Sequence, residues 1–284
     1  RSGNLGGVTV GRRGTPQRTR WGSRVVAVIG VLAVVAGAVL LATGGGADEK
    51  VAVRPANRTP GVPRTTTMPT APVTVAPTTT TTLPSPPFPV GLASTTIVDP
   101  SRGTAARGPT PASAARSLPL RIHYPATAEG DGTPAAAGTY PLVVFAHGFG
   151  ISAADYDAFT RDLAAQGFVV VAPDFPRSST VFPGPPTADD IDEQARDVGF
   201  LIEALVPSTP GATVSAPNGP WTGHVAPGGA GAVGQSDGGN TVARAGGNSC
   251  CRSARVAAVV SLAGDEGRSG GTWGVEGQAP LLLL

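Results

Sequence analysis

The chain has 284 residues and a formal net charge of +2, and only 14% of the residues are charged. A net charge this small argues against nucleic acid as the main partner, because nucleic-acid-binding domains usually have a large net positive charge. The length accommodates one sizeable domain together with additional segments. The basic residues are unevenly distributed, since six arginines precede Asp48, the first acidic residue.

The first predicted element is an apolar segment, residues 25–43. Its stretch "VVAVIGVLAVVAGAVLLA" has no polar residue in 18 positions, and as a helix it would be roughly 27 Å long, close to the thickness of a hydrocarbon core. Arginines before it and none directly after it place the N-terminus in the cytoplasm. We therefore expect a basic cytoplasmic segment, residues 1–24, followed by a single-pass membrane anchor. A long signal peptide is the alternative, and both interpretations put the rest of the chain outside the cytoplasm.

Residues 44–90 are rich in threonine and proline, as in "RTTTMPTAPVTVAPTTTTTLPSPPFP". Such a segment has too few large apolar side chains to offset the entropy lost on ordering. We expect it to be a disordered, extended spacer. The composition changes at about residue 91, so residues 91–284 are predicted to form the folded domain.

Within this domain, short apolar runs alternate with helical patterns. The runs predict strands at 118–125, 141–146, 168–175, directly before Ser236, at 255–264, and from the final "APLLLL". The helical patterns cover 152–167, 189–206 and 237–245. Continuous apolar strands that alternate with helices predict an α/β fold with a mostly parallel sheet and helices on both faces. Ligands of such sheets bind outside the carboxyl ends of the strands.

One of these predicted strand ends carries "GQSDG", the pattern G-x-S-x-G. In a glycine-rich chain the pentapeptide alone fits a surface loop equally well. A strand before it and a helix after it favour a nucleophile elbow, in which a tight turn exposes Ser236 and needs small residues at positions 234 and 238. The N-terminus of the following helix would stabilise negative charge that develops beside the serine.

A second predicted strand ends in "FAHGFG". Acyl transfer needs two donors for the oxyanion of the tetrahedral intermediate. We expect the backbone N–H groups of Asp237, directly after the serine, and of Phe149, in this loop, to supply them. We interpret His147 as a residue that shapes the loop rather than as the catalytic base.

The stretches "PLVVFAHGFG", "LAAQGFVVVAPDFPRS", "DVGFLIEAL", "GQSDGGNTV" and "VAAVVSLAGDE" occur in this order. From about residue 118 to residue 284 the chain thereby resembles the α/β-hydrolase superfamily. Within it, the chain is similar to the bacterial esterases related to dienelactone hydrolase, platelet-activating-factor acetylhydrolase and polyester hydrolases. The resemblance implies a serine hydrolase that forms an acyl-enzyme at Ser236 on a small-molecule, lipid or polymer ester, with no cofactor. The family commonly has His before the serine, where this chain has Gln235.

The resemblance also implies the chain order serine, acid, histidine. The histidines of this chain, His123, His147 and His224, all precede Ser236. We therefore expect the acid and the histidine to lie beyond Leu284, in a C-terminal part that this chain lacks. As alternatives, Asp265 or Glu266 would be the acid, or His224 the base. The remaining acid in a strand-end loop, Asp174, is expected to brace a turn.

Two rival functions stay open at this stage. One is a non-catalytic cell-surface binding protein on a degenerate hydrolase scaffold, and the other is an acyltransferase that uses the same elbow. Phe149 and the loop 175–187 are the predicted lining of a substrate pocket. The adjacent Cys250 and Cys251 could form a vicinal disulfide, pair with other cysteines or remain thiols, and no metal site is predicted because no Cys/His cluster is present.

Overall fold

The computed structural model describes residues 85–264 except residue 216, together with residues 271–272, 274 and 277–284. The predicted segments 1–24 and 25–43, and all but the end of 44–90, lie outside the described residues. Among the helices that the structure does describe, none has the length and apolar character needed to cross a membrane.

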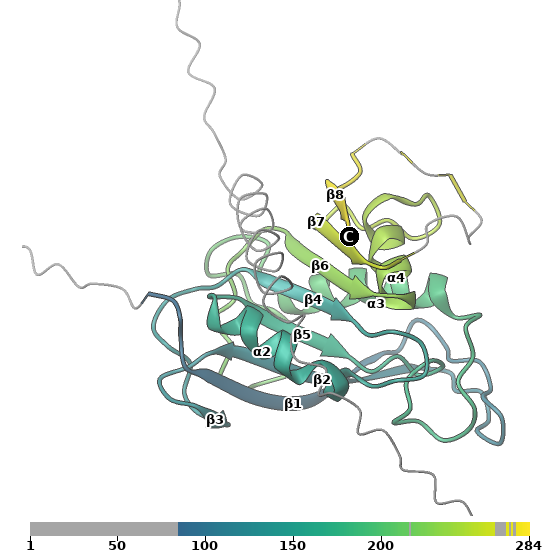
Figure 1. Ribbon diagram of the computed structural model, residues 1–284, viewed down its shortest axis with the longest axis horizontal. Helices are drawn as coiled ribbons and strands as arrows, with labels where there is room; N and C mark the ends of the chain where they lie inside the picture. Colours follow the sequence, from purple (N-terminus) through teal and green to yellow (C-terminus); the bar gives the residue numbers. More distant parts are fainter. Residues whose placement is uncertain (1–84, 216, 265–270, 273, 275–276) are drawn as a thin grey trace, which may run out of the picture.

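The described domain is built on an eight-stranded sheet with the strand order β3-β1-β2-β5-β4-β6-β7-β8 (Figure 1). β2 pairs antiparallel with β1 and β5, whereas every pair from β5 across to β8 is parallel. The strands are β1 (Val90–Asp99), β2 (Arg116–Pro125), β3 (Gly130–Asp131), β4 (Leu142–Ala146), β5 (Val169–Pro173), β6 (Ala230–Gln235), β7 (Val256–Leu262) and β8 (Leu281–Leu283). The predicted α/β class with a mostly parallel sheet is confirmed.

Helices cover both faces of this sheet. They are the 3-10 turn η1 (Ala153–Tyr156), α2 (Asp157–Ala165), α3 (Ile191–Leu205) and α4 (Asp237–Gly247). Successive side chains of β4 point to opposite faces, so Leu142 and Val144 belong to the core cluster of α3 and α4. Val143 and Phe145 belong to the other cluster, with Leu163 of α2. Both core layers around β4 are therefore completed by helices that follow it in the chain.

Two residues just before the predicted domain boundary already take part in the folded structure. Phe88 is buried and its N–H group donates to Ala165 O at 2.8 Å, and Val90 already belongs to β1. β1 was also missed as a strand, because about half of its residues are exposed or partly exposed and it has no continuous apolar run. Gly91 is needed there because a Cβ atom at this position would lie 2.4 Å from the ring of Tyr124.

The predicted helix 152–167 begins as a 3-10 turn and continues as α2. Both the backbone N–H and the hydroxyl of Ser152 donate to Asp155 Oδ2, at 2.8 and 2.7 Å. Ser152 therefore caps the segment as expected, although the turn that it caps is 3-10 rather than α. Gly167 follows the helix with φ = 96°, a conformation that favours glycine.

Candidate active site

Ser236 has an unusual backbone conformation at the junction of β6 and α4. Its φ is 55° and its ψ is −120°, a region that non-glycine residues rarely adopt. The N–H of Ser236 donates to Leu262 O at 2.8 Å, and its carbonyl accepts the N–H of Asn240 at 3.1 Å. These bonds, one to β7 and one within the first turn of α4, hold the turn in place. The side chain of Ser236 is partly exposed.

The two glycines of the motif have no room for a side chain. A Cβ atom on Gly234 would lie 2.1 Å from Gly238 O, and one on Gly238 would lie 2.0 Å from Ala146 O. All of these neighbours are backbone atoms, which cannot rotate away. The close approach brings the start of α4 against the end of β4, and it explains why the sequence has glycine at both positions.

The loop that follows β4 lies directly beside the serine turn, because Ala146 pairs with Gly234 in the sheet. A Cβ atom on Gly148 would lie 2.9 Å from Gln235 Oε1, so this loop packs against the residue before the serine. Among the described residues, neither the N–H of Phe149 nor that of Asp237 has a hydrogen-bond acceptor.

His147 is buried and is hydrogen-bonded to backbone on both ring nitrogens. The N–H of Phe175 donates to Nε2 at 3.1 Å, so Nδ1 carries the ring proton and donates to Gly148 O at 2.7 Å. Burial lowers the pKa of His147, and the bond to Gly148 opposes this only in part. The neutral imidazole of His147 therefore links the loops that follow β4 and β5. Because both of its nitrogens are engaged, it does not act as a base for Ser236.

Asp174, after β5, braces the same region. Its Oδ1 accepts the N–H of Ala153 at 2.9 Å and the hydroxyl of Ser179 at 2.6 Å. Ser179 O and three other carbonyls of the 175–187 loop accept hydrogen bonds from the buried Arg107 guanidinium. The loop that we predicted to line a pocket is therefore held firmly at its base.

Sequence reasoning missed the contact that joins the two halves of the site. The hydroxyl of Tyr156 accepts the N–H of Gly148 at 3.2 Å and donates to Gln235 Oε1 at 2.6 Å. No motif marks Tyr156, and the sequence marks Gln235 only as a departure from the usual histidine. The one available signal was that a polar side chain at position 235 would need a partner.

His147 is engaged on both ring nitrogens, and the other two histidines lie away from Ser236. His224 is partly exposed and its carbonyl accepts the N–H of Tyr140 at 2.7 Å, before the amino end of β4. Ser236 follows the carboxyl end of β6, and a strand of six residues puts about 20 Å between the amino and carboxyl ends of the sheet. His123 is buried on β2, with Nδ1 3.1 Å from Thr160 Oγ1, and three strand spacings separate β2 from β6, roughly 14 Å.

The acid alternatives, Asp265 and Glu266, lie outside the described residues. In the part of the chain that the structure covers, no residue forms a hydrogen bond with Ser236 Oγ. The described residues therefore include a partly exposed serine on a strained turn, two N–H groups without an acceptor among these residues, and no histidine hydrogen-bonded to the serine.

The comparisons with known proteins agree with this geometry. A family model described as Chlorophyllase matches residues 131–242, less than half of the chain. The matched region runs from before β4 into α4 and includes the whole serine turn. A search of curated proteins found no match.

Among solved structures, a ferulic acid esterase from Streptomyces cinnamoneus is similar to this chain, with a TM-score of 0.51 and 23% identity. The match covers 70% of this chain and 66% of the esterase, so the chain spans slightly less than two thirds of that protein's length. The esterase Est22 matches with a TM-score of 0.37 and 14% identity over 66% of this chain and 47% of its own. Together with the strand order, the first match shows that the chain has the α/β-hydrolase fold.

Proposed function

Starting from this α/β-hydrolase fold, we propose that the chain is the main part of a serine esterase with Ser236 as its nucleophile. The observation that carries the proposal is the φ of 55° at Ser236 between two glycines that backbone contacts require. A surface loop of glycine and serine has no reason to hold a serine in this conformation, whereas a nucleophile elbow does.

In the proposed reaction, Ser236 Oγ attacks the carbonyl carbon of a carboxylic ester and its proton passes to a base. The resulting oxyanion accepts hydrogen bonds from the N–H groups of Phe149 and Asp237. The C–O bond to the alcohol then breaks, the alcohol leaves with the proton, and an acyl-enzyme remains. Water hydrolyses the acyl-enzyme and returns the proton to Ser236. No metal or organic cofactor takes part in these steps.

The substrate that we propose is an ester with an apolar group next to the carbonyl. Phe149 is 45% exposed and Val181 is 52% exposed. Their loops are adjacent, because Gly150 N–H donates to Ser178 O at 3.0 Å and Thr180 N–H to Ile151 O at 3.4 Å. Two large apolar side chains on adjacent loops, one of which follows β4 beside the serine turn, favour hydrophobic small-molecule, lipid or polymer esters. The family and structural matches, to chlorophyllase and ferulic acid esterase, support the same substrate class.

The base and the acid are proposed to come from residues outside this chain. All three histidines of the sequence are placed by the structure, and each is too distant or fully engaged. We therefore expect the gene to encode, after Leu284, an aspartate or glutamate and a later histidine. The 284-residue chain by itself should show no ester hydrolysis that depends on Ser236.

The test uses the longer protein that includes the residues encoded after Leu284, assayed with p-nitrophenyl esters. Ser236→Ala should lower kcat/KM by at least about a thousandfold, because removing a nucleophile disables the whole catalytic group. Ser94→Ala is the matched control, since Ser94 is exposed on β1, and it should leave kcat/KM unchanged. Equal activity of Ser236→Ala and the parent protein would refute the assignment.

The absence of a histidine near Ser236 is also what a non-catalytic binding protein on this scaffold would show. A gene without an acid and a histidine after Leu284, together with no Ser236-dependent activity, would favour that alternative. Adding a primary alcohol to the assay separates the third possibility, since an acyltransferase would convert most of the acyl group to the new ester.

We also propose that residues 25–43 anchor the protein in a membrane with the hydrolase domain outside the cytoplasm. The support is the uninterrupted apolar stretch with arginines on one side. The full chain should stay with membranes after alkaline carbonate extraction, and deletion of residues 25–43 should release it. Recovery of the full chain in the medium, cleaved after this segment, would show a signal peptide instead.

A further inference from the structure

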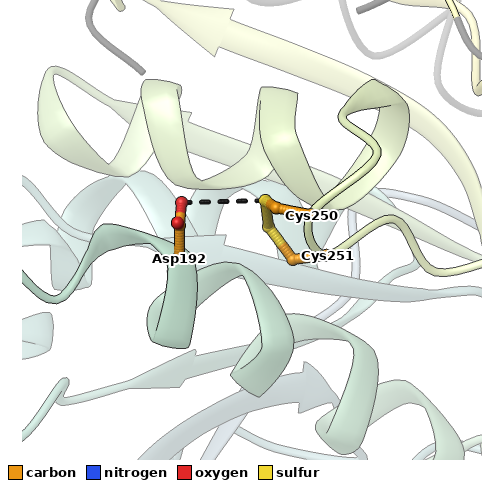
Figure 2. Close-up of side chains that lie close together, drawn as sticks. All are labelled: Asp192, Cys250 and Cys251. Atoms are coloured by element: carbon orange, nitrogen blue, oxygen red, sulfur yellow. Dashed lines mark hydrogen bonds between the residues drawn. A yellow bond between two sulfur atoms is a disulfide. The ribbon is translucent and has the colours of Figure 1, made fainter. Parts of the chain in front are cut away.

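The end of α4 and the beginning of α3 bring together three side chains with metal-binding chemistry. Cys250 and Cys251, which follow α4, are joined by a disulfide, and Asp192 lies in the first turn of α3 (Figure 2). Fifty-eight residues separate Asp192 from Cys250 in the sequence. Cys251 is buried, Cys250 is partly exposed, and the Asp192 side chain is 50% exposed, so the cluster opens to solvent on one side.

The spacing of the three ligand atoms suits a single metal ion. Cys250 Sγ lies 3.6 Å from Asp192 Oδ1, and the two sulfurs and the carboxylate oxygen all lie within 4.8 Å of one another. Sulfur ligands about 2.3 Å from a tetrahedral ion are separated from one another by roughly 3.8 Å. Two thiols released from the disulfide would move apart toward that separation with little movement of the backbone.

The surroundings hold this backbone and balance the charge. Cys250 N–H donates to Asn248 Oδ1 at 3.0 Å, and Arg196 donates to the Cys250 carbonyl at 3.3 Å. The buried Arg244 guanidinium pairs with Asp192. A carboxylate has acceptor sites for both partners, so Asp192 can keep Arg244 while it binds an ion. Two thiolates, one carboxylate, one arginine and a divalent cation sum to zero charge.

We propose that, once the disulfide is reduced, Cys250, Cys251 and Asp192 bind a thiophilic divalent cation such as Zn²⁺ or Cd²⁺, with water in the remaining position. A phosphine reductant and water convert the S–S bond to two thiols and the phosphine to its oxide. Binding of the cation then releases the two thiol protons. The disulfide and the metal exclude one another because each thiolate has to be free to donate to the ion.

The experiment titrates the whole chain with Cd²⁺ after phosphine reduction and removal of the reductant. Cd–thiolate bonds absorb in the ultraviolet, and this chain has only two cysteines, so the absorption reports on this pair alone. The reduced chain should bind Cd²⁺ with this absorption, and the disulfide form should not. The variant with both Cys250→Ser and Cys251→Ser should lose the absorption.

Asp192→Asn tests the third ligand. Loss of a carboxylate ligand should weaken Cd²⁺ binding by at least about tenfold. Even the mutation of a residue that only hydrogen-bonds to a metal ligand typically weakens metal binding by about tenfold or more. Asp162→Asn is the matched control, because Asp162 is an exposed carboxylate on α2, and it should bind like the parent chain. Circular dichroism confirms that each variant is folded.

Three results would overturn the proposal. They are Cd²⁺ binding of equal strength in the disulfide form, unchanged affinity of Asp192→Asn, and a reduced chain that shows no thiolate absorption at saturating Cd²⁺.

Discussion

Backbone contacts require glycine at positions 234 and 238, and this is the strongest evidence that the turn at Ser236 is a nucleophile elbow rather than an ordinary loop. The nearest atoms to a Cβ on Gly234 or Gly238 are carbonyl oxygens of α4 and β4, about 2 Å away. Side chains can rotate to relieve a clash, whereas these carbonyls belong to a helix and a sheet. The serine conformation is therefore maintained by the packing of α4 against β4.

Gly238→Ala should lower the free energy of unfolding by at least about 1–3 kcal/mol, the usual cost of overpacking, and should abolish esterase activity. Gly247→Ala in the same helix is the control. Its nearest neighbour is a side-chain atom of Gln278 at 3.6 Å, so it should be neutral or stabilising by up to about 1 kcal/mol. Urea unfolding measures both changes, and equal stability of the two variants would contradict the packing argument.

The Tyr156 hydroxyl is the second residue-scale feature that the proposed chemistry uses. Tyr156→Phe would leave the buried Gly148 N–H without its acceptor, which costs about 1–3 kcal/mol, and would release the Phe149 loop from Gln235. We expect kcat to fall by about tenfold or more, because small displacements of catalytic groups are costly, with a smaller change in KM.

Tyr140→Phe is the control for this variant. It loses a comparable hydrogen bond, from the Tyr140 hydroxyl to Ala137 O at 2.8 Å, before the amino end of β4. It should be destabilised to a similar degree without a change in kcat. Equal kcat values for the two variants would show that Tyr156 has no role in positioning the loop.

At the scale of elements, β2 and α3 are joined by buried charges. Arg116 has no exposed surface, and its guanidinium contacts Asp197 at 2.7 Å and Asp190 at 2.6 Å. Burial alone would lower the pKa of Arg116, but the two carboxylates outweigh it and raise the pKa above the ordinary value. Arg102 adds a second cation to Asp197 at 2.7 Å. The network fixes α3 on β2.

Asp197→Asn should lower the free energy of unfolding by about 3–5 kcal/mol, since it leaves part of a buried arginine charge uncompensated. The control is Asp157→Asn, which breaks the half-exposed pair with Arg121 and should cost about 0–1 kcal/mol. Chemical denaturation compares the two. Similar losses would mean that the buried network contributes no more than a surface ion pair.

For the whole molecule, the strands with continuous apolar runs and the helices between them could be predicted from the sequence, because burial on both faces of a parallel sheet leaves a strong pattern. β1 could not, since more than half of its residues are exposed or partly exposed and it has no continuous apolar run. The serine turn, Phe149 and Asp237 were found because a motif marks them. Tyr156 and the Asp192–Cys250 contact were missed because only the fold brings residues 79 and 58 positions apart into contact.

The stability of the domain should depend on pH between about 7 and 5. Burial lowers the pKa of both His147 and His123 in the folded state, whereas the unfolded residues titrate near about 6.5. Below that pH the unfolded chain takes up protons that the folded chain excludes, so the free energy of unfolding falls as the pH falls. His147→Gln should reduce this slope in urea unfolding, and an unchanged slope would contradict the buried neutral imidazole.

The most direct test of Ser236 as the nucleophile is mass spectrometry of the protein after reaction with a fluorophosphonate. The experiment uses the longer protein with the residues encoded after Leu284, and peptides are mapped after digestion. We predict a single phosphonylated site at Ser236, absent from Ser236→Ala and retained in Ser94→Ala. Labelling at another serine would contradict the assignment. So would the absence of any labelling, provided that the protein is folded and its added residues include an acid and a histidine.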